Sequence, residues 1–185
     1  MADQRILSTE KMVGAGHATL ADTLNRLALV EHNNDGTHKG IGKLFAVQHA
    51  PISHTGNTAE TTLFSVNIPG GTLGANGRIR INGFLLNTNS ANAKWWYLRF
   101  GGTLFSGAGL TTTDCAAFFH VGIWNENSTN AQAGNPFFHV INNPANVRTG
   151  AVDTTQDQSL AISVQLANAG ETATLRGVAV EILKP

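Results

Sequence analysis

The stretch TTLFSVNIPGGTLGANGRIRINGFL, residues 61–85, decides the fold class. Phe64, Val66 and Ile68 alternate with their neighbours in a period of two, and the same period returns from Ile79 onward. Such alternation is typical of strands that bury one face. The Pro, Gly and Asn residues between the two runs are typical of a turn. The stretch therefore predicts two short strands separated by a turn.

The period of two continues through most of the remaining chain. The further runs that carry it are 44–49, 95–100, 117–125, 137–141, 160–166 and 172–183. Together they make eight short strands separated by Gly, Asn, Thr and Pro turns, and no helical stretch alternates with them. The glycines at 101–102 and 107–109 are interpreted as turn residues. We predict an all-β fold, an antiparallel β-sandwich that is jelly-roll-like, over residues 43–185.

Residues 1–42 have a different pattern. Leu20, Leu24 and Leu27 recur with helical spacing, and Thr19 is a suitable N-cap. We predict an N-terminal arm followed by one short α-helix that ends near residue 32. An isolated helix of this length is marginal, so its leucines must be buried. They pack on the chain's own core, or they mediate self-association or docking into a larger partner.

The composition excludes several classes of protein. The 185 residues contain 12 Lys plus Arg and 12 Asp plus Glu, so the basic surface of a nucleic-acid-binding protein is not expected. No apolar run approaches the roughly 18 residues of a membrane span, and we expect no membrane partner. The single cysteine, Cys115, excludes an internal disulfide. Charged residues are only 13%, which suggests that much of the surface lies against other subunits.

The run 95–100 carries large aromatic side chains on both faces, with Trp95 and Tyr97 on the same one. Together with Lys94 and Arg99 they superficially resemble a stripe that binds single-stranded nucleic acid. That mode depends on a basic groove, which the neutral charge argues against. We interpret Trp95 and Tyr97 as candidate glycan contacts that stack on a sugar ring.

The run 117–125 also carries aromatic side chains on both faces. Phe118, His120 and Trp124 form the second face, opposite Phe119. Because large exposed apolar patches seldom persist on monomers, this face is expected to meet a covering loop, another subunit or a ligand. We interpret these three residues as a candidate subunit interface.

No set of residues predicts catalysis or a bound cofactor. The acidic residues are scattered without the paired spacing of a glycosidase, and no two of the seven histidines form an i, i+4 metal pair on a helix. Cys115 lacks the local signature of a nucleophile. We predict a protein that is not an enzyme and holds no metal or cofactor.

Two segments resemble virion proteins of tailed bacteriophages. Residues 13–39, VGAGHATLADTLNRLALVEHNNDGTHK, are similar to the N-terminal region of small tail-fibre and related proteins. Residues 55–81, TGNTAETTLFSVNIPGGTLGANGRIRI, resemble the opening strands of β-sandwich virion proteins, including the turn around Asn76 and Gly77. The two segments cover less than a third of the chain.

This resemblance implies a non-enzymatic structural component of the phage particle, often a homotrimer. Its N-terminal segment, with Leu20, Leu24 and Leu27, would anchor it to capsid, neck or tail proteins, and the β domain would face outward. A short tail fibre, a head fibre and a capsid decoration protein all fit. Such a protein is assembled in the host cytoplasm and ends on the virion exterior.

Two other functions fit the same sequence. The first is a carbohydrate-binding receptor-recognition module of a phage tail, which would contact a host-surface glycan through Trp95 and Tyr97. The less favoured one is a polysaccharide depolymerase whose acidic residues meet only at a subunit interface.

Overall fold

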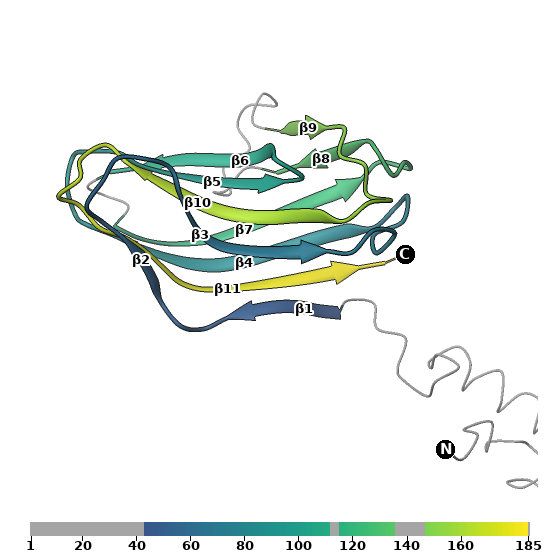
Figure 1. The fold of residues 1–185 in the computed structure, drawn as a ribbon, viewed down its shortest axis with the longest axis horizontal. Coiled ribbons are helices and arrows are strands. Elements are labelled where there is room, and N and C mark those ends of the chain that lie inside the picture. Colours follow the sequence, from purple (N-terminus) through teal and green to yellow (C-terminus); the bar gives the residue numbers. More distant parts are fainter. Residues whose placement is uncertain (1–42, 112–114, 136–146, 185) are drawn as a thin grey trace, which may run out of the picture. The chain divides into compact units, whose positions relative to one another are not determined.

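In the computed structural model the described part of the chain is all β (Figure 1). The described residues are 43–111, 115–135 and 147–184. The expected helix with Leu20, Leu24 and Leu27 lies outside them, as does the expected strand 137–141. Within the described ranges, no helix has the length and apolar character needed to cross a membrane.

The strands form two antiparallel sheets that lie face to face (Figure 1). The larger sheet has the order β1-β11-β4-β7-β8-β9, with β2 also paired to β11. Its strands are β1 (Lys43–Gln48), β2 (Ile52–His54), β4 (Arg78–Asn87), β7 (Ala116–Asn125), β8 (Gln132–Gly134), β9 (Arg148–Gly150) and β11 (Ala173–Leu183). The smaller sheet has the order β3-β10-β5-β6. Its strands are β3 (Thr61–Ile68), β5 (Lys94–Phe100), β6 (Thr103–Leu110) and β10 (Gln158–Leu166).

The order of the longer strands is that of a jelly roll. Leaving out the three-residue strands β2, β8 and β9, the large sheet runs β1-β11-β4-β7 and the small sheet β3-β10-β5-β6. Counted along the chain, these are the first, eighth, third and sixth strands facing the second, seventh, fourth and fifth. Consecutive long strands therefore cross between the sheets, except at the β5–β6 hairpin, which stays within the small sheet. The predicted antiparallel β-sandwich is confirmed.

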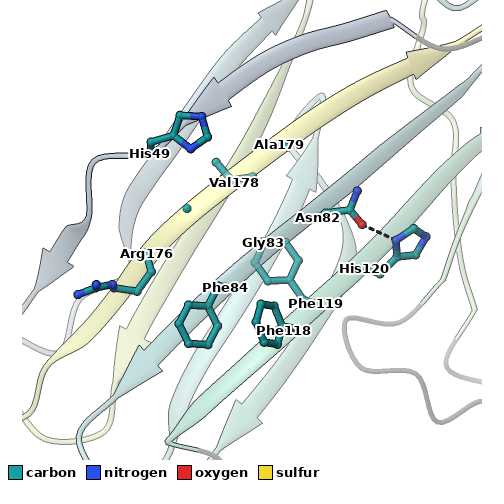
Figure 2. A pocket seen from close by; sticks show the side chains of 11 residues that line it. His49, Asn82, Gly83, Phe84, Phe118, Phe119, His120, Arg176, Val178 and Ala179 are labelled. Carbon is teal, nitrogen blue, oxygen red and sulfur yellow. Dashed lines mark hydrogen bonds between the residues drawn. The ribbon is translucent and has the colours of Figure 1, made fainter.

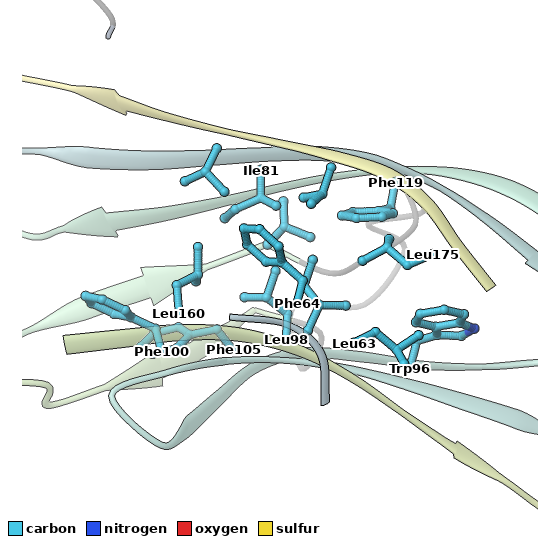
Figure 3. Close-up of a cluster of buried hydrophobic side chains, with 14 of the residues drawn as sticks. Leu63, Phe64, Ile81, Trp96, Leu98, Phe100, Phe105, Phe119, Leu160 and Leu175 are labelled. Atoms are coloured by element: carbon cyan, nitrogen blue, oxygen red, sulfur yellow. The ribbon is translucent and has the colours of Figure 1, made fainter. Parts of the chain in front are cut away.

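The core fills the space between the sheets, as the alternation of apolar residues predicts (Figure 3). From β5 the residues Trp96, Leu98 and Phe100 are fully buried, and from β7 Phe119 and Val121 meet them from the other sheet. At about 25 cal/mol per Å² of buried apolar surface, this contact is the main favourable term in folding. Both inward faces predicted from the sequence are confirmed.

Strand β6 differs from the expectation. Gly101 and Gly102 do form the hairpin turn between β5 and β6, with φ of +54° and +77°. Gly107 and Gly109, however, lie inside β6 and pair with β5. The interpretation of these two as turn glycines is wrong, because large aromatic side chains on β5 occupy the space that their missing side chains leave.

Candidate functional site

Trp95 and Tyr97 form an aromatic platform on the outer face of the smaller sheet. In the β5–β6 pairing Trp95 is directly opposite Gly109, and Tyr97 is directly opposite Gly107. A Cβ atom placed on Gly109 would lie 2.9 Å from two atoms of the indole, so the Trp95 ring covers this glycine. One ring face therefore rests on the backbone of β6, while 47% of the residue stays exposed. We call Trp95, Tyr97 and the glycines beneath them the aromatic platform.

An amide side chain borders the platform on β10. Gln165 pairs directly with Trp95 across the β5–β10 register. The Tyr97 hydroxyl donates a hydrogen bond to Gln165 Oε1 over 3.2 Å. Since this oxygen is the acceptor of Gln165, the amide NH₂ is left to donate beside the indole.

A second ordered polar group lies next to Tyr97. Arg99 binds Glu60 in a two-pronged contact, with Nε to Oε1 at 3.1 Å and Nη2 to Oε2 at 3.0 Å. The Ser163 hydroxyl donates to the same Glu60 Oε1 over 2.6 Å. The Arg99 guanidinium lies 5.5 Å from the centre of the Tyr97 ring. Charged groups fixed in this way lose little side-chain entropy when a ligand binds.

The electrostatics of Glu60 favour its ionised form. The hydrogen bonds from Arg99 lower the pKa of Glu60 below its usual 4.5, partial burial opposes this, and the Ser163 hydroxyl adds to the lowering. The same contact raises the pKa of Arg99. Folding therefore stabilises the carboxylate. The contribution of Glu60 to the free energy of unfolding is present above the unfolded pKa and is lost as the pH falls through the lower folded pKa.

We expect Glu60→Gln to remove part of this pH dependence. Near pH 7 the variant should be less stable than the wild type by about 1 kcal/mol or less, since the pair is one-third exposed to solvent. At an acidic pH below the lowered pKa of Glu60 the difference should shrink, because the wild-type carboxylate is protonated there. Urea unfolding of both proteins at the two pH values measures this, and an unchanged difference would contradict the assignment.

Lys94 does not belong to the platform. It precedes Trp95 on β5, so its side chain points to the other face, where it is fully buried. Its ammonium lies 3.5 Å from Glu171 Oε1 and donates to the Asn92 carbonyl at 2.8 Å. The apparent basic stripe of Lys94 and Arg99 is therefore not a surface feature. Lys94 belongs to the interior, and Arg99 is neutralised by Glu60.

Phe118, His120 and Trp124 lie together on the outer face of the larger sheet. Phe118 is 80% exposed and stacks on Phe84 of β4, with ring centres 4.6 Å apart. His120 is hydrogen-bonded to Asn82, and the Arg78 guanidinium lies 4.6 Å from the Trp124 ring. The sequence predicts both aromatic sets, and the sandwich separates them, because β5 and β7 belong to different sheets.

Several groups at the platform are not found by the sequence analysis. Gln165, Ser163 and Glu60 come from segments distant from β5 in the sequence, and only the strand register brings them beside it. The sequence does contain a signal that Gly107 and Gly109 pair with β5. Their spacing of two matches the spacing of Trp95 and Tyr97, as expected for cross-strand partners.

Hydrogen bonds favour the ionised forms of Asp153 and Asp157. Hydrogen bonds lower the pKa of Asp157, through the Gly70 backbone, and of Asp153, through the Thr155 side chain. A glycosidase acid needs the opposite shift. Over the described ranges, no three His, Cys, Asp or Glu side chains gather in a way that could hold a metal ion.

No protein-family model matches the chain, and no curated protein sequence matches it. Distant likenesses occur among solved structures. The insecticidal delta-endotoxin Cry8Ea1 from Bacillus thuringiensis is 11% identical with a TM-score of 0.39, covering 72% of this chain and 19% of the toxin. Lectin I from Ulex europaeus, in complex with a fucose glycoside, is 10% identical with a TM-score of 0.35, covering 76% and 92%. The CBM2 module of the evolved Dit protein of Lactobacillus casei BL23 phage J-1 is 11% identical with a TM-score of 0.34, covering 63% and 67%.

This chain thus spans about a fifth of the endotoxin's length. All three structures are so distant that they carry no argument about what the chain does.

Proposed function

We propose that the chain is a non-enzymatic β-sandwich domain that binds carbohydrate at the aromatic platform. The observation that carries the proposal is the position of the Trp95 side chain, whose ring covers Gly109 while 47% of the residue remains exposed. A ring fixed flat on a sheet offers its outer face to the C–H face of a pyranose. Ordering such a ring on binding costs little, because the strand already fixes it.

The polar surroundings of the platform support a sugar ligand over an apolar one. The free NH₂ of Gln165 can donate to a ring hydroxyl beside the indole, and the Glu60 carboxylate held by Arg99 can accept from one. The same face continues with hydroxyl groups, such as the hydrogen-bonded pair Ser65 and Ser159 at 3.1 Å. A mixture of aromatic rings and a few fixed polar groups is typical of small-ligand sites.

We also propose that the chain does not hydrolyse the carbohydrate that it binds. The lowered pKa of Glu60 keeps it from donating a proton near neutral pH, which a depolymerase would need. We therefore favour binding over hydrolysis. Incubation with capsule or lipopolysaccharide should release no new reducing ends.

We further propose that the domain is displayed on the exterior of a bacteriophage particle. This part rests on the resemblance of residues 13–39 and 55–81 to virion proteins. The N-terminal segment with Leu20, Leu24 and Leu27 would anchor it to other virion proteins after assembly in the host cytoplasm. The neutral net charge supports the absence of a nucleic-acid partner.

The test is a glycan array with the full chain and two matched variants. We expect Trp95→Ala to weaken binding at least about tenfold, the size typical of a lost aromatic anchor. Phe118→Ala removes an exposed ring from the other sheet, so it should bind as the wild type does. Circular dichroism should show that both variants are folded, since both side chains are exposed.

Two results would count against the proposal. One is the absence of any sugar signal above background on a broad array. The other is a sugar signal that Phe118→Ala abolishes and Trp95→Ala leaves intact, which would place binding on the opposite face.

A further inference from the structure

The outer face of the larger sheet carries apolar side chains on four neighbouring strands, β1, β11, β4 and β7, beside polar ones such as Asn82 and His120. Directly paired residues point to the same side of a sheet, so the register identifies the outward residues. The apolar ones include Leu44, Val47, Ala179, Phe84, Leu86 and Phe118. Leu44 is 58% exposed and Phe118 80%. We call this surface the apolar outer face. Patches of this kind mark interaction sites.

Charges on this face are compensated in part within the chain. Arg80 pairs with Glu181 at 3.1 Å, both on outward positions of neighbouring strands. The Arg78 guanidinium lies over the Trp124 ring. Arg176 lies on the same face, where it lines a pocket together with Phe84 and Phe118. The Arg80–Glu181 pair adds no net charge and does not repel the same pair on an identical surface, whereas Arg78 and Arg176 keep their charges.

The apolar outer face also has a hollow and a projection side by side. The hollow has a volume of about 570 Å³, and its lining includes the small residues Gly177 and Ala179 and the charged Arg176. Figure 2 shows the stacked rings of Phe84 and Phe118 on one side of it and His49 on the other. Phe118 projects beside the hollow that it helps to line. A two-fold pair would let each Phe118 enter the hollow of the other copy.

We propose that the apolar outer face binds a second copy of this chain, sheet against sheet, in a two-fold dimer. The area is sufficient for a stable pair. Strands β1, β11, β4 and β7 have 6, 11, 10 and 10 residues, which at about 3.4 Å per residue and about 4.8 Å spacing span roughly 600 Å² per copy, or roughly 1,200 Å² in total. Specific stable interfaces begin at about 1,200 Å². A closed three-fold ring would need two different complementary patches instead of one.

The pairing has a consequence for ligand binding that rests on the proposed function. The aromatic platform lies on the smaller sheet, and the apolar outer face lies on the larger one. In the dimer the two platforms therefore face away from each other. Such a dimer cross-links separate glycan chains and does not hold two sites of one short glycan.

Light scattering coupled to size exclusion tests the pairing without any glycan, so its outcome is independent of the sugar proposal. The full chain at micromolar concentration should have twice the mass of 19.5 kDa. Phe118→Asp places a charge at the centre of the interface and should weaken the dimer at least about thirtyfold. Because Phe118 is exposed, the variant should keep the circular dichroism of the wild type.

Trp95→Ala is the matched control, because it removes an exposed aromatic ring from the opposite sheet. It should leave the dimer intact. A monomer at micromolar concentration overturns the proposal. This holds whether the face is then covered by residues outside the described ranges or left exposed to solvent. So does a trimer, or a dimer that Phe118→Asp does not weaken.

Discussion

Replacing Glu171 with alanine is expected to lower the free energy of unfolding by about 3 to 5 kcal/mol, the cost of leaving a buried charge without its partner. The Lys94 residue is completely buried, and only 6% of the Glu171 side chain is exposed. Lys94 Nζ has three oxygen partners within 3.5 Å besides Glu171: Ser90 Oγ at 2.7 Å, the Asn92 carbonyl at 2.8 Å and the Ser90 carbonyl at 3.4 Å. Without Glu171 this ammonium would have no negative charge in contact with it.

The polar cluster around Glu171 links the connection between β4 and β5 to the connection between β10 and β11. Ser90 and Asn92, between β4 and β5, donate hydrogen bonds to the carboxylate of Glu171, which precedes β11. Burial raises the pKa of Glu171, but the hydrogen bonds from Ser90 and Asn92 and the charge of Lys94 outweigh it and leave the pKa lowered. The stabilisation should therefore persist as the pH falls to the usual 4.5 and be lost below it.

Chemical denaturation of the wild type and Glu171→Ala measures the effect. Glu181→Ala is the matched control, because the Arg80–Glu181 pair is about one-third exposed and should contribute no more than about 1 kcal/mol. The double variant Lys94→Met/Glu171→Leu removes both charges and should recover most of the loss. If Glu171→Ala unfolds at nearly the wild-type denaturant concentration, Lys94 is not held by this carboxylate.

The alternation of residues allowed the sandwich and its two inward faces to be predicted, because a strand's faces are set by local sequence alone. It could not show that Trp95 and Phe118 lie on opposite sides of the molecule. That depends on which sheet receives β5 and which receives β7, and the pairing of distant strands decides it. The candidate site was predicted through its aromatic residues only.

Two misreadings have specific physical causes. Gly107 and Gly109 were assigned to turns because glycine usually weakens a strand, but here the indole and phenol rings of β5 cover them and replace the missing packing. Lys94 was grouped with the surface because lysine is almost never fully buried without a partner. Its partner Glu171 is 77 residues away along the chain and meets it only through the fold.

A second large loss of stability is expected for Gln132→Leu, in strand β8 next to the edge strand β9 of the larger sheet. Gln132 is 1% exposed and makes three buried hydrogen bonds: Nε2 donates to Asn125 Oδ1 and to the Val152 carbonyl, each at 3.0 Å, and Oε1 accepts from the Val152 amide at 2.8 Å. Each buried group that loses its partner costs about 1 to 3 kcal/mol, so we expect a total loss of about 3 to 5 kcal/mol.

Leucine has nearly the shape of glutamine, so this variant tests hydrogen bonding more than packing. Asn125 Nδ2 would keep its hydrogen bond to Thr154 Oγ1 at 2.9 Å, whereas Asn125 Oδ1 and the Val152 carbonyl and amide would lose their partners. The region around Val152 should then exchange its amide hydrogens faster than the core strands β4 and β11 do. Gln156→Leu, at an exposed position, is the control and should change the free energy of unfolding by less than about 0.5 kcal/mol. Equal effects of the two variants would mean that the buried amide of Gln132 does not tie β8 to the segment that follows β9.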